Sequence, residues 1–415
     1  MSDKTAPSLF TPVLIASCLV LLTGFAIRAS FGVFQIPIAD QFGWLRSEFS
    51  MAIAIQNLAW GIGQPIFAAI AEKFGDKRAI MLGALAYAVG LVLSAGAVTP
   101  GAHHLLEVLV GFGIAGTGFG VILSIVGRAA SDEHRSLALG ITTAAGSAGQ
   151  VVGPPIAEAL LRVMNWSEVF VIFALAIIAV MLVLPMLGPG RAATKQELEE
   201  TFSEVLVKAL RDPSYFMIFL GFFSCGYQLA FVTAHFPAFV TEACAAIPDG
   251  GVFAALGVDT TSALGAFAIA VIGLANIAGT ITAGALGRYF SKKYLLAAIY
   301  TGRTIVAAWF ILVPMTPVTV MVFSVAMGSL WLATVPLTSG LIAHIYGLRY
   351  MGTLYGVVFL SHQLGSFLGV WMGGFMYDLY GSYDFVWWVG VGVGAFSAII
   401  HLPVREAPLP AARAA

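Results

Sequence analysis

The stretch from Val169 to Leu187, VFVIFALAIIAVMLVLPML, decides the fold class of this chain. It contains no charged residue, and as a helix rising ~1.5 Å per residue it is long enough to cross the hydrocarbon core of a bilayer. Similar stretches recur along the 415 residues, of which 59% are hydrophobic and 10% are charged. Soluble domains are ~25% charged. The composition therefore excludes a single water-soluble globule and predicts an all-helical membrane protein.

Twelve such stretches follow one another between short polar breaks, and we predict that each is a transmembrane helix. They are continuous apolar runs rather than alternations of apolar and polar residues, which excludes a β-barrel. The first stretch is longer than the apolar part of a signal peptide and contains Arg28, so we expect it to be retained. The predicted spans are Pro12–Phe34, Ser50–Ile70, Ile80–Val98, Leu105–Ile125, Leu137–Leu161, Val169–Leu187, Tyr215–Phe239, Ala263–Leu286, Tyr294–Val313, Val318–Ile342, Thr353–Phe375 and Phe385–Leu402.

The basic residues are divided unequally between the two sides of these spans. Of the 20 Lys and Arg residues, Arg46 and Arg162 lie on the side opposite the N-terminus, Arg28 and Arg303 lie inside spans, and all others lie on the N-terminal side. By the positive-inside rule, both termini are predicted to be cytoplasmic, in a multi-pass protein of the inner (plasma) membrane. The net charge of -1 leaves no basic surface for nucleic acid.

Motifs for catalysis and metal binding are missing from the sequence. Cys18, Cys225 and Cys244 lie far apart, without the spacing of a metal site. The phosphate-binding GxxxxGK loop and the GxSxG nucleophile elbow are absent. We therefore expect no enzyme, no cofactor and no bound metal, and a driving force that comes from a gradient.

The two halves of the sequence match each other at an offset of 216 residues. The matching pairs are Gly63 with Gly279, Lys77 with Lys293, Gly140 with Gly356, Gly149 with Gly365 and Gly153 with Gly369. We predict an N-terminal six-helix bundle (residues 1–187), a cytoplasmic linker (188–214) and a C-terminal six-helix bundle (215–415). Two such units in the same orientation suggest a substrate site between them and alternating access. Chance matching of glycine-rich sequence is the alternative.

The loop after the second span, AAIAEKFGDKR from Ala68 to Arg78, resembles the signature of the major facilitator superfamily, and the resemblance covers nearly the whole chain. The signature combines a small residue, an acid, a glycine and basic residues. The second copy, GALGRYFSKK from Gly284 to Lys293, lacks the acid. An acid beside basic residues can form an ion pair that stabilises one conformation of a transporter. The alternative is a solvated loop without such a role, and we favour this alternative for the second copy. The gating candidates are Glu72, Lys73, Asp76 and Arg78.

The start of the fifth span, RSLALG from Arg135 to Gly140, is similar to a motif of the monocarboxylate-porter branch of that superfamily. Arg135 is therefore a further gating candidate. Two features depart from that branch: its acid–Gly–aromatic motif before the first span is absent, and Thr280 stands where its eighth helix has an arginine. A carboxylate substrate would need another cationic partner.

Arg28 is the best candidate for that partner. A charge at the bilayer centre costs ~3 kcal/mol, so an intramembrane arginine usually faces a cavity or a partner. The planar guanidinium suits a carboxylate, but a structural ion pair and snorkelling to the interface remain alternatives. Arg303 lies in the ninth span, which the resemblance places at the periphery, and we expect it to pair or pack structurally.

The resemblance implies that the first, fourth, seventh and tenth spans line the transport path. His235 could bind an anion or relay a proton, or could be a histidine satisfied by a neighbouring carbonyl. Other polar and aromatic residues recur at helical spacing and predict a mixed cavity, although interhelical hydrogen bonds would also explain them. The substrate-binding candidates are Arg28, Asn57, Trp60, Phe231, His235, Asn276, Thr280, Trp331, His362 and Gln363.

Two further expectations concern acids near the outer side. Glu107 stands where the superfamily usually has an arginine, so it is a candidate proton carrier together with His235, or a partner of Arg28 or Arg303. A carboxylate at the outer interface is the alternative. Arg162 and Asp378 are gating candidates that match at the offset of 216, and a salt bridge between them at the outer side is one hypothesis, which we do not favour.

These features favour a monomeric secondary transporter that moves a small organic anion across the lipid bilayer by alternating access, coupled to protons. The alternative is proton-driven efflux of an amphipathic metabolite or drug, which the tryptophans and phenylalanines of the spans would suit. A membrane sensor or scaffold would need a soluble domain, and the longest polar segment, residues 188–214, is too short for one.

Overall fold

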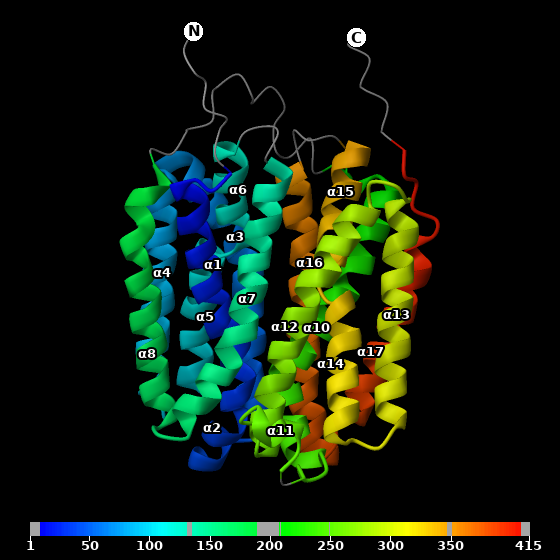
Figure 1. Ribbon diagram of the computed structural model, residues 1–415. Helices are drawn as coiled ribbons and strands as arrows, with labels where there is room; N and C mark the ends of the chain where they lie inside the picture. Colours follow the sequence, from blue (N-terminus) through cyan, green and yellow to red (C-terminus); the bar gives the residue numbers. More distant parts are fainter. Residues whose placement is uncertain are drawn as a thin grey trace, which may run out of the picture.

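The computed structural model describes residues 9–130, 135–188, 207, 209–248, 250–346 and 351–407. Helices and turns account for these residues, with no strand among them, which confirms the predicted all-helical fold. The long helices run side by side, and α1 begins at the same end of the bundle at which α17 ends (Figure 1). We call this end the terminus side and the opposite end the distal side.

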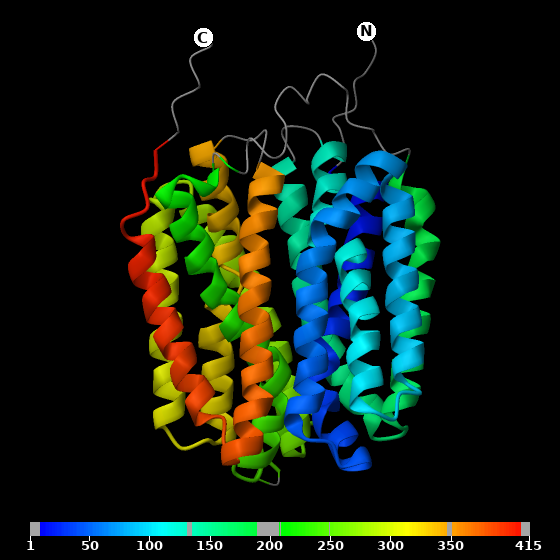
Figure 2. The ribbon, with the colours of Figure 1, turned by 180° about the vertical axis from the view of Figure 1, so that it is seen from behind.

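The first half of the chain supplies one set of helices, and Figure 2 shows it beside the set from the second half. Its elements are α1 (Pro12–Ser30), η1 (Phe31–Phe34), α2 (Gln35–Phe42), α3 (Arg46–Phe74), α4 (Asp76–Ser94), α5 (Pro100–Thr117), α6 (Phe119–Ala129), α7 (Arg135–Leu161), α8 (Trp166–Ala179) and η2 (Val180–Leu187). The second half supplies α10 (Pro213–Ala243), α11 (Val252–Ala255), α12 (Thr261–Leu286), α13 (Lys292–Leu312), α14 (Pro317–Leu330), α15 (Thr334–Tyr346), α16 (Met351–Tyr380) and α17 (Asp384–His401).

Each of the twelve predicted spans falls on one of these helices or on an interrupted pair. Ten helical segments of the described chain are long and apolar enough to cross a membrane. The other two predicted spans lie in α3 and α7, which are 29 and 27 residues long. The first span was predicted too short, because helical structure continues to Phe42.

Several helices begin where the sequence supplies a capping side chain followed by proline. Thr11 Oγ1 accepts a hydrogen bond of 3.2 Å from the backbone N–H of Leu14, and Asp212 accepts one of 2.9 Å from Ser214. A proline at the first helical position follows each cap, where its missing N–H costs nothing. These caps hold α1 and α10 at the terminus side.

Two apolar clusters correspond to the two halves of the sequence. One joins buried residues from Ala16 to Leu187 with three residues of the second half, and the other joins residues from Ala209 to Val404. Residues 189–206 and 208, which hold most of the predicted linker, lie outside the described part of the chain. The proposed division at residues 187 and 215 therefore stays a prediction.

The halves meet along two pairs of helices, α3 with α16 and α7 with α12, and where η1 lies against α10. Glycines permit the closest approaches. A Cβ atom on Gly32 of η1 would lie 2.3 Å from the carbonyl oxygen of Thr233, and one on Gly374 of α16 would lie 2.6 Å from that of Arg46. Any larger residue at these two positions would push the halves apart.

Candidate transport site

Arg28 lies past the middle of the first membrane-spanning segment, and its side chain is partly buried. Its Nη2 donates a hydrogen bond of 3.0 Å to Asn57 Oδ1 on α3. Its guanidinium carbon lies 4.7 Å from the ring centroid of Trp60, three residues farther along α3, which is within cation–π range. The structure thus brings three of the predicted substrate-binding residues into contact.

The guanidinium of Arg28 retains unused hydrogen-bonding capacity. Its Nε is buried without a partner, and among the described residues no carboxylate lies within ion-pair distance of it. The alternative of a structural ion pair, including one with Glu107, is not realised there. An arginine at this depth with free donors in a planar fork is suited to a carboxylate ligand.

Aromatic side chains from both halves adjoin Trp60, the ring that faces Arg28. Phe25 and Phe359 lie at 6.0 and 5.1 Å from Trp60, measured between ring centroids. Phe359 in turn stacks on His362 at 5.5 Å. The Trp60 indole N–H donates to Gln64 Oε1 at 3.0 Å, which fixes its ring. An apolar wall therefore lies beside the cation, as an organic anion with an apolar body would require.

Asn276 of α12 makes structural hydrogen bonds. Its Nδ2 donates to Ser147 Oγ of α7 at 3.0 Å, and its Oδ1 accepts from Thr280 at 3.0 Å and from the backbone N–H of Leu332 at 2.9 Å. The last bond satisfies a backbone group at the break between α14 and α15, beside buried Trp331. For Asn276 and Thr280, the alternative of interhelical hydrogen bonding thus accounts for the contacts.

His235 is fully buried on the distal part of α10 and has partners on both ring nitrogens. Gln35 Nε2 lies 3.1 Å from Nδ1, and the carbonyl oxygen of Val370 lies 2.7 Å from Nε2. Because the amide donates and the carbonyl accepts, the neutral tautomer with its proton on Nε2 satisfies both bonds. Phe231 packs at 5.6 Å from this ring. This arrangement is that of a histidine whose hydrogen bonds are satisfied by Gln35 of the first half and Val370 of the second.

His362 and Gln363 of α16 are buried. The Gln363 Oε1 lies 3.2 Å from His362 Nδ1, and the Gln363 Nε2 has no partner. A Cβ atom on Gly61 of α3 would lie 2.8 Å from the Gln363 side chain. Gln363 therefore sits where α3 and α16 meet, four residues beyond the aromatic Phe359.

At the distal side, Arg46 connects the two halves. Its side chain forms a salt bridge with Glu242 of α10 and a hydrogen bond of 3.2 Å to the Tyr383 hydroxyl. The backbone N–H groups of Arg46 and Ser47 donate to the two carboxylate oxygens of Asp378, each at 2.8 Å. One carboxylate of α16 thus caps the first turn of α3 across the interface.

The second distal contact joins α7 to the start of α12. Arg162 pairs with Asp259 at 2.8 Å, and Glu158 accepts a hydrogen bond of 2.9 Å from Ser262. The hypothetical salt bridge between Arg162 and Asp378 is not formed, since Asp378 instead accepts from the backbone of Arg46 and Ser47. These two residues are equivalent in the repeat, so they lie on opposite sides of the pseudo-symmetry axis, and each contacts the start of a helix in the other half.

Glu107 on α5 is fully buried, and its interactions differ from those expected. Gln56 Nε2 donates to Glu107 Oε2 at 2.7 Å, and His103 Nε2 lies 3.8 Å from Glu107 Oε1. The alternative of a carboxylate exposed at the outer interface therefore does not hold. Gln56 adjoins Asn57 on α3, so one helix contacts both Glu107 and Arg28.

Arg303 on α13 is fully buried in the second half. Its Nη1 donates to Cys225 Sγ at 3.3 Å and its Nη2 to the Cys225 carbonyl oxygen at 3.5 Å. Cys225 Sγ also lies 3.4 Å from Thr334 Oγ1. This enclosed position supports the predicted structural role of Arg303 and distinguishes it from Arg28.

The signature loop lies at the terminus side, between α3 and α4. Asp76 is the first residue of α4 and accepts a hydrogen bond of 2.5 Å from Arg128 Nη2 at the end of α6. Arg78 is exposed. The side chains of Glu72, Lys73 and Arg135 lie outside the described residues. The gating roles of all these residues stay predictions.

Sequence reasoning missed Arg46, Glu242 and Tyr383, because Arg46 was read only as one of two basic residues on the distal side. The repeat carried a usable signal: at the offset of 216, Arg46 matches Ser262 and Asp378 matches Arg162. All four residues make contacts between the halves at the distal side: Arg46 with Asp378, Arg162 with Asp259, and Ser262 with Glu158.

Comparisons with known proteins agree with this architecture. The chain is 24% identical over 411 residues to an uncharacterised MFS-type transporter of Bacillus subtilis, with 96% of each chain covered. It is 23% identical to monocarboxylate transporter 13 of Rattus norvegicus, covering 86% of this chain and 80% of that protein. The fold matches the inward open conformation of the xylose transporter XylE from E. coli with a TM-score of 0.72, 14% identity and 96% of each chain covered.

The family model of the Major Facilitator Superfamily matches residues 16–258, which is more than half of the chain. That match, the multi-pass helical fold and the transporter relatives agree with the resemblance noted in the signature loop. The chain therefore belongs to the major facilitator superfamily and is a membrane transporter, not an enzyme.

Proposed function

We propose that this protein is a proton-coupled secondary transporter of a small organic anion with an apolar body, and that Arg28 binds the anionic group. The observation that carries the proposal is the guanidinium of Arg28, which is partly exposed at mid-depth and has no carboxylate partner in the described chain. The Nε of Arg303 also lacks a partner, but that side chain is fully buried. Trp60, Phe25 and Phe359 would contact the apolar body. The similarity to a protein named a monocarboxylate transporter supports a carboxylate as the anion.

Alternating access is supported by the unequal closure of the two sides. Among the described residues, the hydrogen bonds and ion pairs between the halves lie at mid-depth or at the distal side, as in Asn276–Ser147 and Arg46–Glu242. If both termini are cytoplasmic in the inner membrane, as the basic residues predict, this conformation faces inward. We take the functional unit to be a monomer, since each half contributes to one site.

Glu107 is the proposed proton carrier. An ionised carboxylate buried with only an amide and a distant imidazole is costly, so its charge state should respond to nearby charge. Gln56 and Asn57 are neighbours on α3 and contact Glu107 and Arg28 respectively. A movement of α3 on substrate binding would therefore change the surroundings of both groups together.

The test is a matched pair of substitutions, Arg28→Met and Arg303→Met. Purified protein is first screened for thermal stabilisation by lactate, pyruvate, oxalate and aromatic acids, and counterflow in proteoliposomes is then measured for each ligand that binds. We expect Arg28→Met to abolish binding and counterflow without lowering the thermal midpoint. Arg303→Met should retain both, because a flexible apolar chain fills a buried site that holds no carboxylate.

Unchanged anion flux in the Arg28→Met protein would overturn the proposal. The alternative function is proton-driven efflux of an amphipathic metabolite or drug, which the aromatic wall beside Trp60 favours. A broad resistance phenotype on overexpression, with no anion counterflow by the wild type, would support that alternative.

A further inference from the structure

The second copy of the signature loop, at the start of α13, lacks the acid of the first copy. In the first half, Asp76 begins α4 and pairs with Arg128 at 2.5 Å. The offset of 216 places Lys292 at the position of Asp76 and His344 at that of Arg128. The sequence of the second half therefore puts two basic side chains where the first half has an acid and a base.

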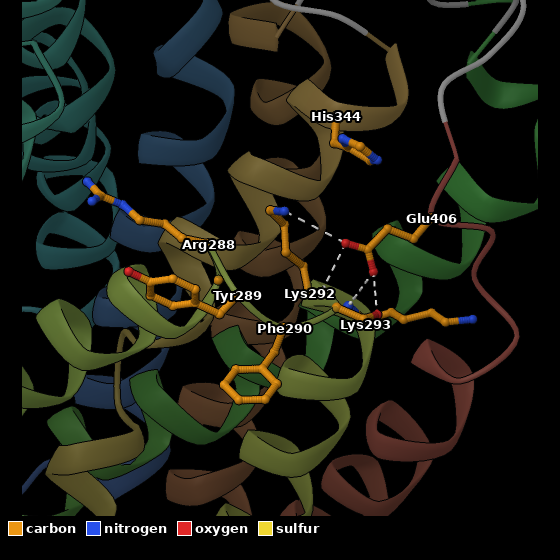
Figure 3. Close-up of a pocket in the computed structure, with 9 residues that line it drawn as sticks. Arg288, Tyr289, Phe290, Lys292, Lys293, His344 and Glu406 are labelled. Carbon is orange, nitrogen blue, oxygen red and sulfur yellow. Dashed lines mark hydrogen bonds and ion pairs between the residues drawn. The ribbon is translucent and has the colours of Figure 1, made fainter.

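The structure places an acid at this position from a distant part of the chain. Glu406, five residues after α17 ends, points at the first turn of α13 (Figure 3). Its Oε1 accepts a hydrogen bond of 3.0 Å from the backbone N–H of Lys292, and its Oε2 accepts bonds from Ser291 Oγ at 2.5 Å and from the backbone N–H of Lys293 at 3.3 Å. A carboxylate at a helix N-terminus satisfies free donors and the positive end of the helix dipole.

The surroundings of Glu406 are otherwise basic. A cavity of about 440 Å³ lies against this turn, and its described lining includes Arg288, Lys292, Lys293 and His344, with Glu406 as its acidic side chain. The Lys292 ammonium lies 3.8 Å from the Glu406 carboxylate. Without that carboxylate, the turn would hold several like charges with no compensating acid from the lining.

Two further contacts hold the segment that carries Glu406. Lys293 Nζ donates to the carbonyl oxygen of Leu402 at 3.1 Å, and the backbone N–H of Arg405 donates to Ser214 Oγ at 3.1 Å. The segment after α17 thus joins the starts of α13 and α10 at the terminus side. Its position is fixed by contacts on both sides of the acid.

We propose that Glu406 supplies the acid that the second signature copy lacks, and is a gating residue of the second half. It holds the turn between α12 and α13 as the Asp76–Arg128 pair holds the turn between α3 and α4. This inference rests on the proposed transport function, in which such turns must move as fixed parts of each half. Because Glu406 lies at the terminus side and Arg28 at mid-depth, its loss should slow the conformational cycle without changing substrate affinity.

The test compares Glu406→Gln with the double variant Lys292→Asp/Glu406→Gln in the full-length protein. Lys292→Asp puts an acid on α13 itself, at the position equivalent to Asp76. Asp384→Asn is the matched control, since Asp384 is an exposed acid in the first turn of α17 at the distal side. Hydrogen exchange of residues 287–296 and the Vmax and KM of counterflow are measured for each protein.

We expect Glu406→Gln to raise exchange in the turn about five-fold and to lower Vmax by a similar factor at unchanged KM, as for the loss of a helix cap. The double variant should restore both, and Asp384→Asn should alter neither. Normal exchange in Glu406→Gln would overturn the proposal. A loss that Lys292→Asp does not restore would also overturn it, because Glu406 would then only anchor the C-terminal segment. If no anion is transported by the wild type, the proposed function fails, and the exchange measurements still decide the placement of the acid.

Discussion

The distal side and the terminus side of the molecule use their charged residues differently. At the distal side, Arg46, Asp378 and Arg162 interact with residues of the other half. At the terminus side, the described pairs Asp76–Arg128 and Glu406–Lys292 stay within one half. Contacts between halves must break during alternating access, whereas contacts within a half can persist throughout. The location of a charged pair therefore predicts whether its loss shifts the equilibrium between conformations or, for a pair within one half, loosens a local turn and slows the cycle.

The largest effect is expected where backbones of the two halves touch. Gly32→Val adds side-chain atoms at a position where even a Cβ atom would lie 2.3 Å from the Thr233 carbonyl oxygen. A backbone oxygen cannot move aside as a side chain can, and overpacking costs about 1–3 kcal/mol, enough to shift the equilibrium by one to two orders of magnitude. The measurement is the alkylation rate of a cysteine introduced as Thr233→Cys in a protein without native cysteines. Gly32→Val should raise this rate strongly, because it shifts the equilibrium toward the conformation that is open at the distal side.

Gly392→Val on α17 is the control, because a Cβ atom there meets nothing within 4 Å. If Gly32→Val leaves both the alkylation rate and counterflow unchanged, the distal side does not require the close contact between η1 and α10.

A smaller effect is expected from Asp378→Asn. The carboxylate accepts two backbone N–H bonds from the first turn of α3, and an amide can accept only one of them while its NH₂ faces the other donor. Loss of a charge-assisted bond costs about 1.5 kcal/mol, or roughly ten-fold in the equilibrium toward the distal-open conformation. Distances between spin labels at the distal ends of α3 and α16 report this shift. An unaltered distance distribution would contradict the role of this carboxylate in closure.

The sequence predicted the fold better than it predicted the contacts of the site. Continuous apolar runs and the concentration of basic residues on one side depend on local composition, so the spans and the all-helical fold could be inferred from the sequence. The family followed from the resemblance of the loop from Ala68 to Arg78 to a known signature. Which residues touch depends on packing between distant segments. Arg28 with Asn57 and Trp60 combines α1 with α3, and no spacing in the sequence encodes that contact.

Two hypotheses about contacts failed for the same kind of physical reason. For Glu107, the alternative to a proton carrier was a carboxylate at the outer interface. In the structure Gln56 and His103 enclose it. A salt bridge between Arg162 and Asp378 was a hypothesis because these residues match in the repeat. In the structure Asp378 contacts the start of α3, and Arg162 contacts the segment before α12, which is the helix equivalent to α3 in the repeat. Residues that match in a two-fold repeat therefore need not touch each other.

A local effect of pH is expected at the terminus side. Burial raises the pKa of Glu406, but hydrogen bonds from the Ser291 hydroxyl and from the amides of Lys292 and Lys293 outweigh it and bring the pKa below the usual 4.5. Because the folded pKa lies below the unfolded one, the stabilisation is complete above about pH 4.5 and is lost as pH falls through the folded value.

The groups that face Glu406 are the basic side chains of Arg288, Lys292, Lys293 and His344, so none of them can replace its carboxylate. Hydrogen exchange of residues 287–296, corrected for its intrinsic pH dependence, should thus be constant from about pH 8 to pH 5.5 and accelerate below about pH 4.5. The Glu406→Gln protein should exchange at its higher rate throughout. Acceleration at low pH in that variant would assign the effect to another group.

The smallest effect is expected from Arg162→Gln, although Arg162 also bridges the halves at the distal side. Its hydrogen bond holds the pKa of the Asp259 carboxyl below the usual 3.8, so the pair is fully charged near neutral pH and loses its interaction only on acidification. Both side chains are largely exposed, at 42% and 59%, and solvent and salt screen such pairs. The counterflow of Arg162→Gln should therefore stay within about two-fold of the wild-type value. This ratio between variant and wild type should not vary with pH between about 6 and 8. A shift in the spin-label distances as large as that of Asp378→Asn would contradict this expectation. An exposed ion pair would then stabilise the closed distal side as much as a partly buried carboxylate that caps a helix, and burial would not explain the difference between the two contacts.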